Sequence, residues 1–379
     1  MSKLRTLFLI SIFVLSGCQS GPQRFSNIAL DVGFKDIAVT FIAYTDTKER
    51  FDAYYTNLVD RYTELGHLYD KYNNYEGLVN LKTLNDTAGQ GPQKVDPRLV
   101  DLLELSRSWD AASWHTFNPS LGAVLNIWHA YREEGKVLNQ EEPQAYGQVP
   151  SLQELQTANQ CTGWNNIVFN QDQSTVEITN PCTQLDVGGI GKGYATDLVA
   201  DALIQEGLDS AILNIGDSSI ITIGSKPDGS EWGIGVSKPT RPVLLGANTI
   251  DTLYFKGSIS VSTSGDNQNF YIADDGQYYH HLIDPNTLFP VVSPLHAVTV
   301  VTSMSAGDAE ALSKALFILP YDQATLFLDD FTQTHPDVFI GALWVFENGQ
   351  EPQATHVIES EGYMLVHTDN LIEHSRLYR

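Results

Sequence analysis

The sequence predicts an α+β fold, a single domain of mixed strands and helices, and three observations carry this prediction. Segments with strand-like and helix-like patterns follow one another along most of the 379 residues. Hydrophobic residues make up 42% of the chain, which is enough for a large core. The sequence contains neither an internal repeat nor a linker that separates two domains.

The first half of the chain predicts one strand and two long helices. Residues 36–45 are apolar and β-branched, which favours a strand. Asp46 and Glu49 then have the spacing of a capping box, and large apolar residues follow at helical spacing. Asp96-Pro97 predicts the cap and the first residue of a second helix. Residues 139–160 are polar, and we expect them to form an excursion outside the core.

The second half predicts a denser series of elements. Val176–Thr179 alternates like a strand. Apolar residues between 195 and 203 have helical spacing, and Gly207 is the expected C-terminal stop. Two paired strands and an apolar helix that stops at Pro320 complete the prediction, at 210–216, 219–224 and 306–319.

The N-terminus predicts export. Lys3 and Arg5 precede an apolar run from Leu7 to Leu15, which is too short to span a bilayer as a mature helix. A basic start followed by a short apolar core is typical of a secretory signal peptide. We therefore expect residues 1–17 to be a signal peptide.

The residues around Cys18 predict a lipid anchor. Leu15-Ser16-Gly17-Cys18 resembles the lipobox of bacterial lipoproteins, in which the cysteine is lipidated and becomes the new N-terminus. The alternative is an ordinary signal peptide with a chance cysteine. With lipidation, residues 18–33 are expected to be a polar tether that holds the protein on the periplasmic side of a bacterial membrane. Gln19 in place of Asp favours the outer membrane by resemblance to the bacterial sorting rule.

Two cysteines remain after Cys18. Export would place Cys161 and Cys182 in an oxidising compartment, where such a pair favours one disulfide. Closing a loop of this length stabilises a protein by about 3 kcal/mol in the chain-entropy model. The alternative is a pair of free, buried thiols.

The charge of the chain excludes one class of partner. Asp and Glu number 46 against 22 Lys and Arg, which gives a formal net charge of −24. Because a phosphate backbone would be repelled by such a protein, we expect no nucleic-acid partner.

A glycine-rich segment, residues 185–193, directly precedes the helix that we expect around residues 195–203. Exposed N–H groups, the positive end of a helix dipole and Lys192 together could hold phosphate, although a tight strand-to-helix turn is the alternative. The segment departs from the Walker pattern at Asp186 and Gly193, where Gly and Ser or Thr are needed. It departs from the dinucleotide pattern at Tyr194.

A second candidate site is the segment His280-His281-Leu282-Ile283-Asp284-Pro285. A histidine with a carboxylate three residues later could be a general base that the carboxylate orients. The alternative is a polar turn without a chemical role.

The order of several motifs is more specific than any one of them. Asn118-Pro119-Ser120-Leu121-Gly122, the glycine segment with Lys192, Asn214-Ile215-Gly216, Thr263-Ser264-Gly265-Asp266, the histidine segment and Ala311–Phe317 follow in this order. This series resembles the ApbE family of FAD:protein FMN transferases, over residues 34–345. The resemblance implies a single ApbE-like (T-fold-like) domain with a flavin cleft over residues 34–379.

The resemblance also implies an enzymatic activity. Members bind FAD, use Mg²⁺ at its pyrophosphate, and transfer FMN to a Thr or Ser hydroxyl of an exported acceptor protein while AMP leaves. The usual acceptors are respiratory electron-transport subunits. Other activities stay open, namely a flavin-binding lipoprotein without transfer and an FAD pyrophosphatase.

Site residues follow by motif from the same resemblance. It implies that His281 is the base and that Asp284 orients it, and that the carbonyl of Gly189 is a metal ligand. The residues implied to contact FAD are Tyr72, Asn118, Pro119, Ser120, Asp186 and Lys192.

The sequence departs from the family at the metal-binding helix. Glu310 stands where the family has a liganding Asp, and Lys314 where it has a liganding Thr. One hypothesis is that the Lys314 charge takes the place of the metal, so that Mg²⁺ dependence is weak or lost. The alternative is that Asp308 or Glu310 binds Mg²⁺ normally in a different helix register.

Overall fold

The computed structural model describes residues 21–34, 37–141, 143–216, 218–240 and 249–379. The predicted signal peptide, Cys18 and Gln19 lie outside these residues. Within the described part of the chain, no helix is both long enough and apolar enough to cross a membrane.

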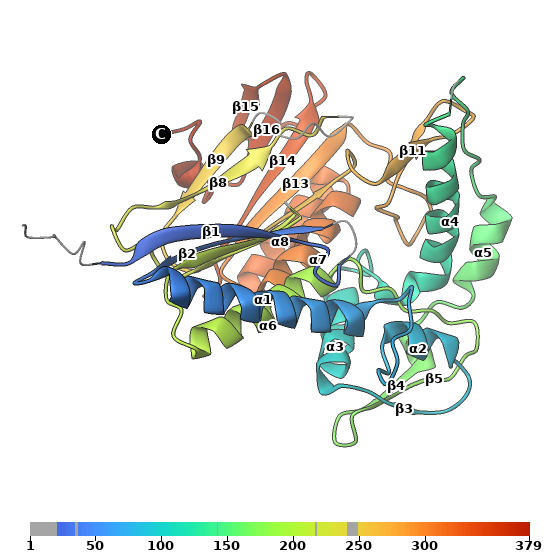
Figure 1. Cartoon of the computed structure of the whole chain (residues 1–379). Helices are drawn as coiled ribbons and strands as arrows, with labels where there is room; N and C mark the ends of the chain where they lie inside the picture. Colours follow the sequence, from blue (N-terminus) through green and yellow to red (C-terminus); the bar gives the residue numbers. More distant parts are fainter. Residues whose placement is uncertain (1–20, 35–36, 142, 217, 241–248) are drawn as a thin grey trace, which may run out of the picture.

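A large antiparallel sheet is the centre of the fold (Figure 1). Its strand order does not follow the chain order, so distant segments lie side by side. In spatial order the strands are β1 (Gln23–Leu30), β2 (Ala38–Thr45), β6 (Ala211–Ile215), β7 (Ser219–Ile223), β10 (Ser260–Gly265), β13 (Leu295–Thr302), β14 (Ile340–Glu347), β16 (Tyr363–His367) and β15 (Val357–Ser360).

The two faces of this sheet are covered by different layers. Along β14, Ala342 and Trp344 belong to the core under the helices, whereas Leu343 and Val345 belong to a second core on the opposite face. This alternation is what a strand buried on both faces requires. The helical layer consists of α1 (Lys48–Tyr69), α6 (Gly191–Gln205), α7 (Ala306–Ile318) and α8 (Tyr321–Thr334), and the other layer is the hairpin of β8 (Trp232–Ser237) and β9 (Thr249–Phe255).

Two smaller units complete the fold. The α4 lobe has a core of its own around the buried Trp128 and contains α4 (Gly122–Leu138), α5 (Leu152–Asn159), β11 (Phe270–Ile272) and β12 (Tyr278–His280). The other unit surrounds a three-stranded sheet and contains α2 (Leu81–Asp86), β3 (Gln93–Lys94), α3 (Pro97–Ala112), β4 (Ile167–Asn170) and β5 (Thr175–Ile178). The described part of the chain also forms three 3-10 helices: η1 (Pro119–Leu121), η2 (Trp164–Asn166) and η3 (Ile372–His374).

Most predicted elements are confirmed at the predicted places. Asp96 caps α3 through Arg98 N, with Pro97 as the first helical residue. Strands β6 and β7 pair antiparallel, as expected. The structure also joins Cys161 and Cys182 in a disulfide, with their Cα atoms 5.4 Å apart.

Three local expectations need correction. The tether prediction is wrong for residues 23–30, because they form β1 and pair along their whole length with β2. The cap of α1 is Thr47 rather than Asp46, since the Thr47 side chain accepts a hydrogen bond from Arg50 N. The excursion at 139–160 contains α5, whose Leu155 is fully buried in the core of the α4 lobe.

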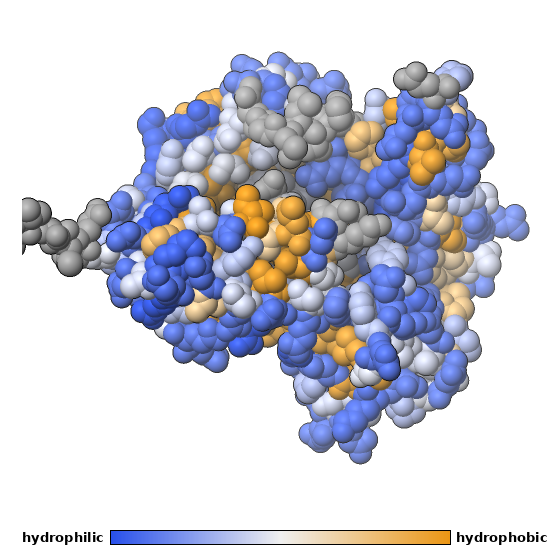
Figure 2. Space-filling model, viewed as in Figure 1, coloured by the Kyte–Doolittle hydropathy of each residue, from blue (hydrophilic) through white to orange (hydrophobic). Residues whose placement is uncertain are grey.

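The surface near β1 is partly apolar. Figure 2 shows a largely hydrophilic face with a compact hydrophobic area over β1 and α1. Ile28 and Leu30 on β1 are 57% and 69% exposed. Their outward direction follows from the alternation of side chains along β1, which is an edge strand of the sheet. Neither residue lines the cleft described below.

Candidate active site

A cleft of about 800 Å³ lies where the large sheet, α6, α7 and the α4 lobe meet. Most residues that the sequence predicts for the site line it, although they come from segments far apart in the chain. These lining residues are Tyr72, Asn118, Pro119, Asp186, Gly189, Lys192, His281, Glu310 and Lys314. Ser120, Asp284 and Asp308 are not among the residues that line it.

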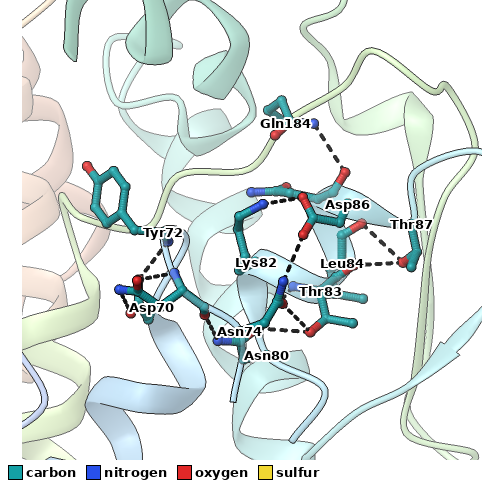
Figure 3. A network of polar contacts seen from close by, with 12 residues as sticks. Asp70, Tyr72, Asn74, Asn80, Lys82, Thr83, Leu84, Asp86, Thr87 and Gln184 are labelled. Atoms are coloured by element: carbon teal, nitrogen blue, oxygen red, sulfur yellow. Dashed lines mark hydrogen bonds and ion pairs between the residues drawn. The ribbon is translucent and has the colours of Figure 1, made fainter. Parts of the chain in front are cut away.

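Tyr72 lines the cleft from the loop that follows α1. Asp70 holds this loop, because its Oδ1 accepts from Tyr72 N at 2.6 Å and its Oδ2 accepts from the Tyr75 hydroxyl at 2.8 Å. Figure 3 shows this network continuing through Asn80 and α2 toward Gln184. The Tyr72 ring is 54% exposed and is therefore available to stack on a planar ligand.

Asp186 is fixed by a residue that the sequence analysis missed. Lys71 Nζ lies 2.6 Å from Asp186 Oδ2, and both side chains are nearly buried. Burial alone would raise the pKa of Asp186, but the Lys71 ammonium, helped by the Gly188 N–H and Arg132, holds the pKa below its usual value. The sequence could not indicate this pair, because the two residues are 115 positions apart.

The segment 118–120 is a structural turn beside the cleft. Asn118 Oδ1 accepts from Ser120 N at 3.0 Å and from Ser120 Oγ at 2.7 Å. Ser120 is fully buried, and its hydroxyl is used within the turn, so its contact with flavin stays a prediction. The Pro119 carbonyl accepts from Asp186 N at 2.9 Å, which ties this turn to the glycine segment.

The glycine segment starts α6 and packs this helix against α7. A Cβ on Gly193 would lie 2.4 Å from the Ala306 carbonyl oxygen, so no larger residue fits there. Asp197 Oδ1 and Oδ2 accept from Ala306 N and Gly307 N at 2.7 and 2.9 Å, which joins the middle of α6 to the N-terminus of α7. The first turn of α6 has no side-chain cap from Ile190, and its N-terminus faces the cleft through Lys192.

Lys192, Glu310 and Lys314 form a charged cluster on the cleft wall. Lys192 Nζ lies 3.4 Å from Glu310 Oε1, and Lys314 Nζ lies 3.3 Å from the Glu310 carbonyl oxygen. Glu310 is 1% exposed, and neither carboxylate oxygen has a hydrogen-bond partner among the described residues. Burial lowers the pKa of Lys314 to about 8 while Glu310 opposes this shift, so the ammonium form predominates at pH 7.

The residues present do not fit a Mg²⁺ site. Asp308 belongs to the capping box of α7, where Ser305 Oγ donates to it at 2.7 Å, and Trp109 Nε1 donates to its other oxygen at 2.7 Å. The described residues hold no group of three or more Asp, Glu, His or Cys side chains suited to a metal. Mg²⁺ requires oxygen ligands, whereas an ammonium stands beside Glu310, the one of the two predicted metal-ligand carboxylates that lines the cleft.

His281 faces the cleft but is not paired with Asp284. Asp284 Oδ1 instead accepts from Asn286 N at 2.8 Å within its own turn, so the expectation that it orients His281 is wrong for the described residues. His281 Nδ1 is buried without a hydrogen-bond partner among these residues. Burial first, and then nearby cations including Arg132, lower the pKa of His281 well below 6.5, so the ring is neutral at pH 7.

Helix α4 adds two further residues that the sequence analysis missed. His129 and Arg132 line the cleft from one face of α4, and Arg132 Nη2 lies 2.9 Å from His129 Nδ1. The Tyr72 and His129 rings are 4.9 Å apart between centroids. His129 and Arg132 are three positions apart and therefore lie on one face of α4. The sequence shows this spacing, but only the packing of α4 shows that this face meets the cleft.

Comparison with known proteins finds relatives over most of the chain. The sequence model of the ApbE family matches residues 37–339. A Treponema pallidum protein named FAD:protein FMN transferase is 28% identical over 291 residues, which cover 74% of each chain. A Chlamydia trachomatis protein of the same name is 25% identical and covers 84% of this chain and 92% of its own.

Solved structures show the same fold. The ApbE protein of Thermotoga maritima superposes with a TM-score of 0.69 at 24% identity, over 86% of this chain and 96% of its own. The flavin transferase ApbE of Vibrio cholerae has a TM-score of 0.68 at 18% identity, over 93% of this chain and 99% of its own. The predicted α+β, ApbE-like fold is therefore confirmed, and the chain belongs to the ApbE family.

Proposed function

We propose that this chain is an FAD:protein FMN transferase, which moves FMN from FAD to a Thr or Ser hydroxyl of an acceptor protein and releases AMP. The observation that carries the proposal is the cleft that combines a lysine-bearing helix N-terminus with a neutral histidine, whose Nδ1 has no hydrogen-bond partner among the described residues. The names of the curated relatives support it, since they are FAD:protein FMN transferases.

The reaction is a phosphoryl transfer in which the protein supplies position and charge. The acceptor hydroxyl oxygen forms a bond to the phosphorus of the FMN half, and the bond from that phosphorus to the bridging oxygen breaks. AMP leaves with the bonding electron pair, and His281 takes the proton of the hydroxyl. Lys192 and the α6 N-terminus line the cleft, which supports the proposal that they hold the phosphates.

His281 is suited to this step because it stays neutral. A protonated imidazole could not accept a proton, and the lowered pKa keeps the ring unprotonated at pH 7. No step of this mechanism uses Mg²⁺, because the residues around Glu310 do not fit that ion.

One experiment separates transfer from the two other activities. The protein is incubated with FAD and an exported respiratory subunit that has been purified without flavin, and the mixture is then denatured. Transfer predicts yellow, fluorescent acceptor that keeps its flavin, and a Thr→Ala acceptor variant stays unlabelled. An FAD pyrophosphatase would give free FMN and AMP, and a flavin-binding lipoprotein would give neither product, so either result would refute transfer.

The proposed location is the periplasmic side of a bacterial membrane, with a lipid on Cys18 and the outer membrane favoured by Gln19. The Cys161–Cys182 disulfide supports an oxidising compartment. Cys18→Ser should abolish incorporation of labelled fatty acid and move the protein to the soluble fraction. Unchanged membrane association of this variant would contradict the lipid anchor.

A further inference from the structure

The cluster of Lys192, Glu310 and Lys314 brings two ammonium groups to one buried glutamate, one at its carboxylate and one at its backbone carbonyl. Lys192 is 3.4 Å from the carboxylate itself, and Lys314 reaches the carbonyl of the same residue. All three residues line the cleft, although Lys192 belongs to α6 and the other two to α7. Two positive groups and one negative group give the cluster one net positive charge.

Lys314 also occupies the space beside Gly189. A Cβ on Gly189 would lie 3.2 Å from Cδ and Cε of Lys314, so the lysine stem packs closely over this glycine. The resemblance had assigned Gly189, Glu310 and position 314 to one metal site. Here a fixed cation stands among these positions, and its repulsion would oppose a divalent ion only a few ångströms away.

We propose that Lys192 and Lys314 together bind the pyrophosphate of FAD directly, in the place where a divalent cation would otherwise stand. The inference rests on the proposed function only in taking FAD as the ligand. Glu310 holds both lysines on the cleft wall while the site is free of nucleotide. When the pyrophosphate binds, its oxygens accept charge-assisted hydrogen bonds from the two ammonium groups.

Burial makes this arrangement effective. An isolated buried ammonium is costly, and the adjacent carboxylate offsets that cost for Lys314. The carboxylate oxygens of Glu310 lack hydrogen-bond partners among the described residues, so the carboxylate itself interacts with the cluster through charge. A phosphate anion adds the negative charge that this net positive cluster lacks.

The first test needs no variant. FAD is titrated into the whole protein in EDTA and in excess Mg²⁺, and binding is followed by the quenching of flavin fluorescence. We expect the two dissociation constants to agree within about twofold. An affinity at least about tenfold higher with Mg²⁺ would overturn the proposal. Mn²⁺, titrated alone and with FAD while its magnetic resonance signal is recorded, should remain free in solution, and stoichiometric binding would also overturn it.

The second test removes one charge. Lys314→Met keeps the length of the side chain and should weaken FAD binding in EDTA by about tenfold or more. Lys48→Met is the matched control, because Lys48 is an exposed residue at the start of α1, and its affinity should equal the wild-type value. Wild-type affinity in Lys314→Met would contradict the proposal.

The thermal unfolding of each variant is recorded beside the titration. If Lys314→Met does not fold, Lys192→Met provides the same charge removal from α6, with the same expected loss of affinity. These readouts measure FAD binding and not transfer. A protein that binds FAD equally in EDTA but never labels an acceptor would therefore support the lysine pair while refuting the proposed function.

Discussion

At the residue scale, His281 has the clearest chemical prediction. His281→Asn should lower the rate of acceptor labelling by roughly 10²–10⁴-fold, since the proton acceptor is lost. FAD affinity should change little, because the nucleotide is held by other groups. The control is His115→Asn, whose side chain is 73% exposed on the α3–η1 loop and whose positive φ of 63° Asn tolerates. Labelling by His281→Asn at the wild-type rate would exclude the ring as the base.

The lowered pKa of His281 predicts a particular pH profile. Since burial and the nearby cations favour the neutral ring, the base stays active as the pH falls through 6.5. The value of kcat/KM for FAD, which reports the free enzyme, should therefore stay level from pH 7.5 to 6 and decline only at lower pH. A tenfold fall for each pH unit that begins near pH 6.5 would show an ordinary histidine and contradict this environment.

Lys71 and Asp186 make a prediction about stability. Lys71→Met leaves a nearly buried carboxylate without its counter-ion and should cost about 3–5 kcal/mol of unfolding free energy, measured in urea. Adding Asp186→Leu removes that carboxylate and should restore most of the loss. A double variant as unstable as Lys71→Met would show that the packing of the lysine stem, rather than the unpaired charge, is what matters.

Only some residues of the candidate site could be predicted from the sequence. Lys192 and His281 were predicted because they belong to short motifs whose spacing is visible in the chain. Lys71 and Arg132 were missed, because their positions depend on how α1 and α4 pack around the cleft. Asp284 and Asp308 were misassigned, since each carboxylate is taken up by a local turn or cap that sequence spacing does not distinguish from a site.

At the element scale, the contact between α6 and α7 fixes the part of the cleft that carries Lys192, Glu310 and Lys314. Gly193→Ala should lower the melting temperature, because its Cβ would meet the Ala306 carbonyl at 2.4 Å and separate the two helices. Gly191→Ala is the matched control, since its nearest neighbour would be Val187 Cγ2 at an ordinary 3.4 Å. Equal melting temperatures for the two variants would mean that the helices can move apart without cost.

Helices and strands were predicted well where their sequence signals are local, and were missed where they depend on distant residues. Helices α3 and α7 were predicted well, because caps, proline and helical spacing all lie within the segment. Strand β1 was missed, because its polar residues resemble a tether and its order comes from pairing with β2. The order of the strands in the large sheet could not be read from the chain, since most neighbours there are distant in sequence.

At the scale of the whole molecule, the disulfide makes the stability of the protein depend on an oxidising environment. Cys161 and Cys182 are separated by 21 positions, so removing the bond by Cys161→Ala with Cys182→Ala should cost about 3 kcal/mol. A reductant should lower the melting temperature of the wild type toward that of the double variant and leave the variant unchanged. Insensitivity of the wild type to a reductant that has opened the bond would contradict a stabilising role.

The net charge of −24 makes the local cations more important. FAD is an anion, so the protein as a whole repels it, and binding depends on the short-range field within the cleft. Lys192, Lys314 and Arg132 provide that field from three different helix positions. The acidic balance, from which we expect no nucleic-acid partner, fits a nucleotide site because these cations are gathered in one cleft.

The most direct test of the account is the ratio of AMP released to flavin covalently bound, measured in one reaction with FAD and the acceptor subunit. AMP is quantified by chromatography, and bound flavin by the mass of the intact acceptor, which should rise by one FMN less one water. The account predicts one AMP for each flavin bound. AMP in excess, accompanied by free FMN and an acceptor of unchanged mass, would contradict it.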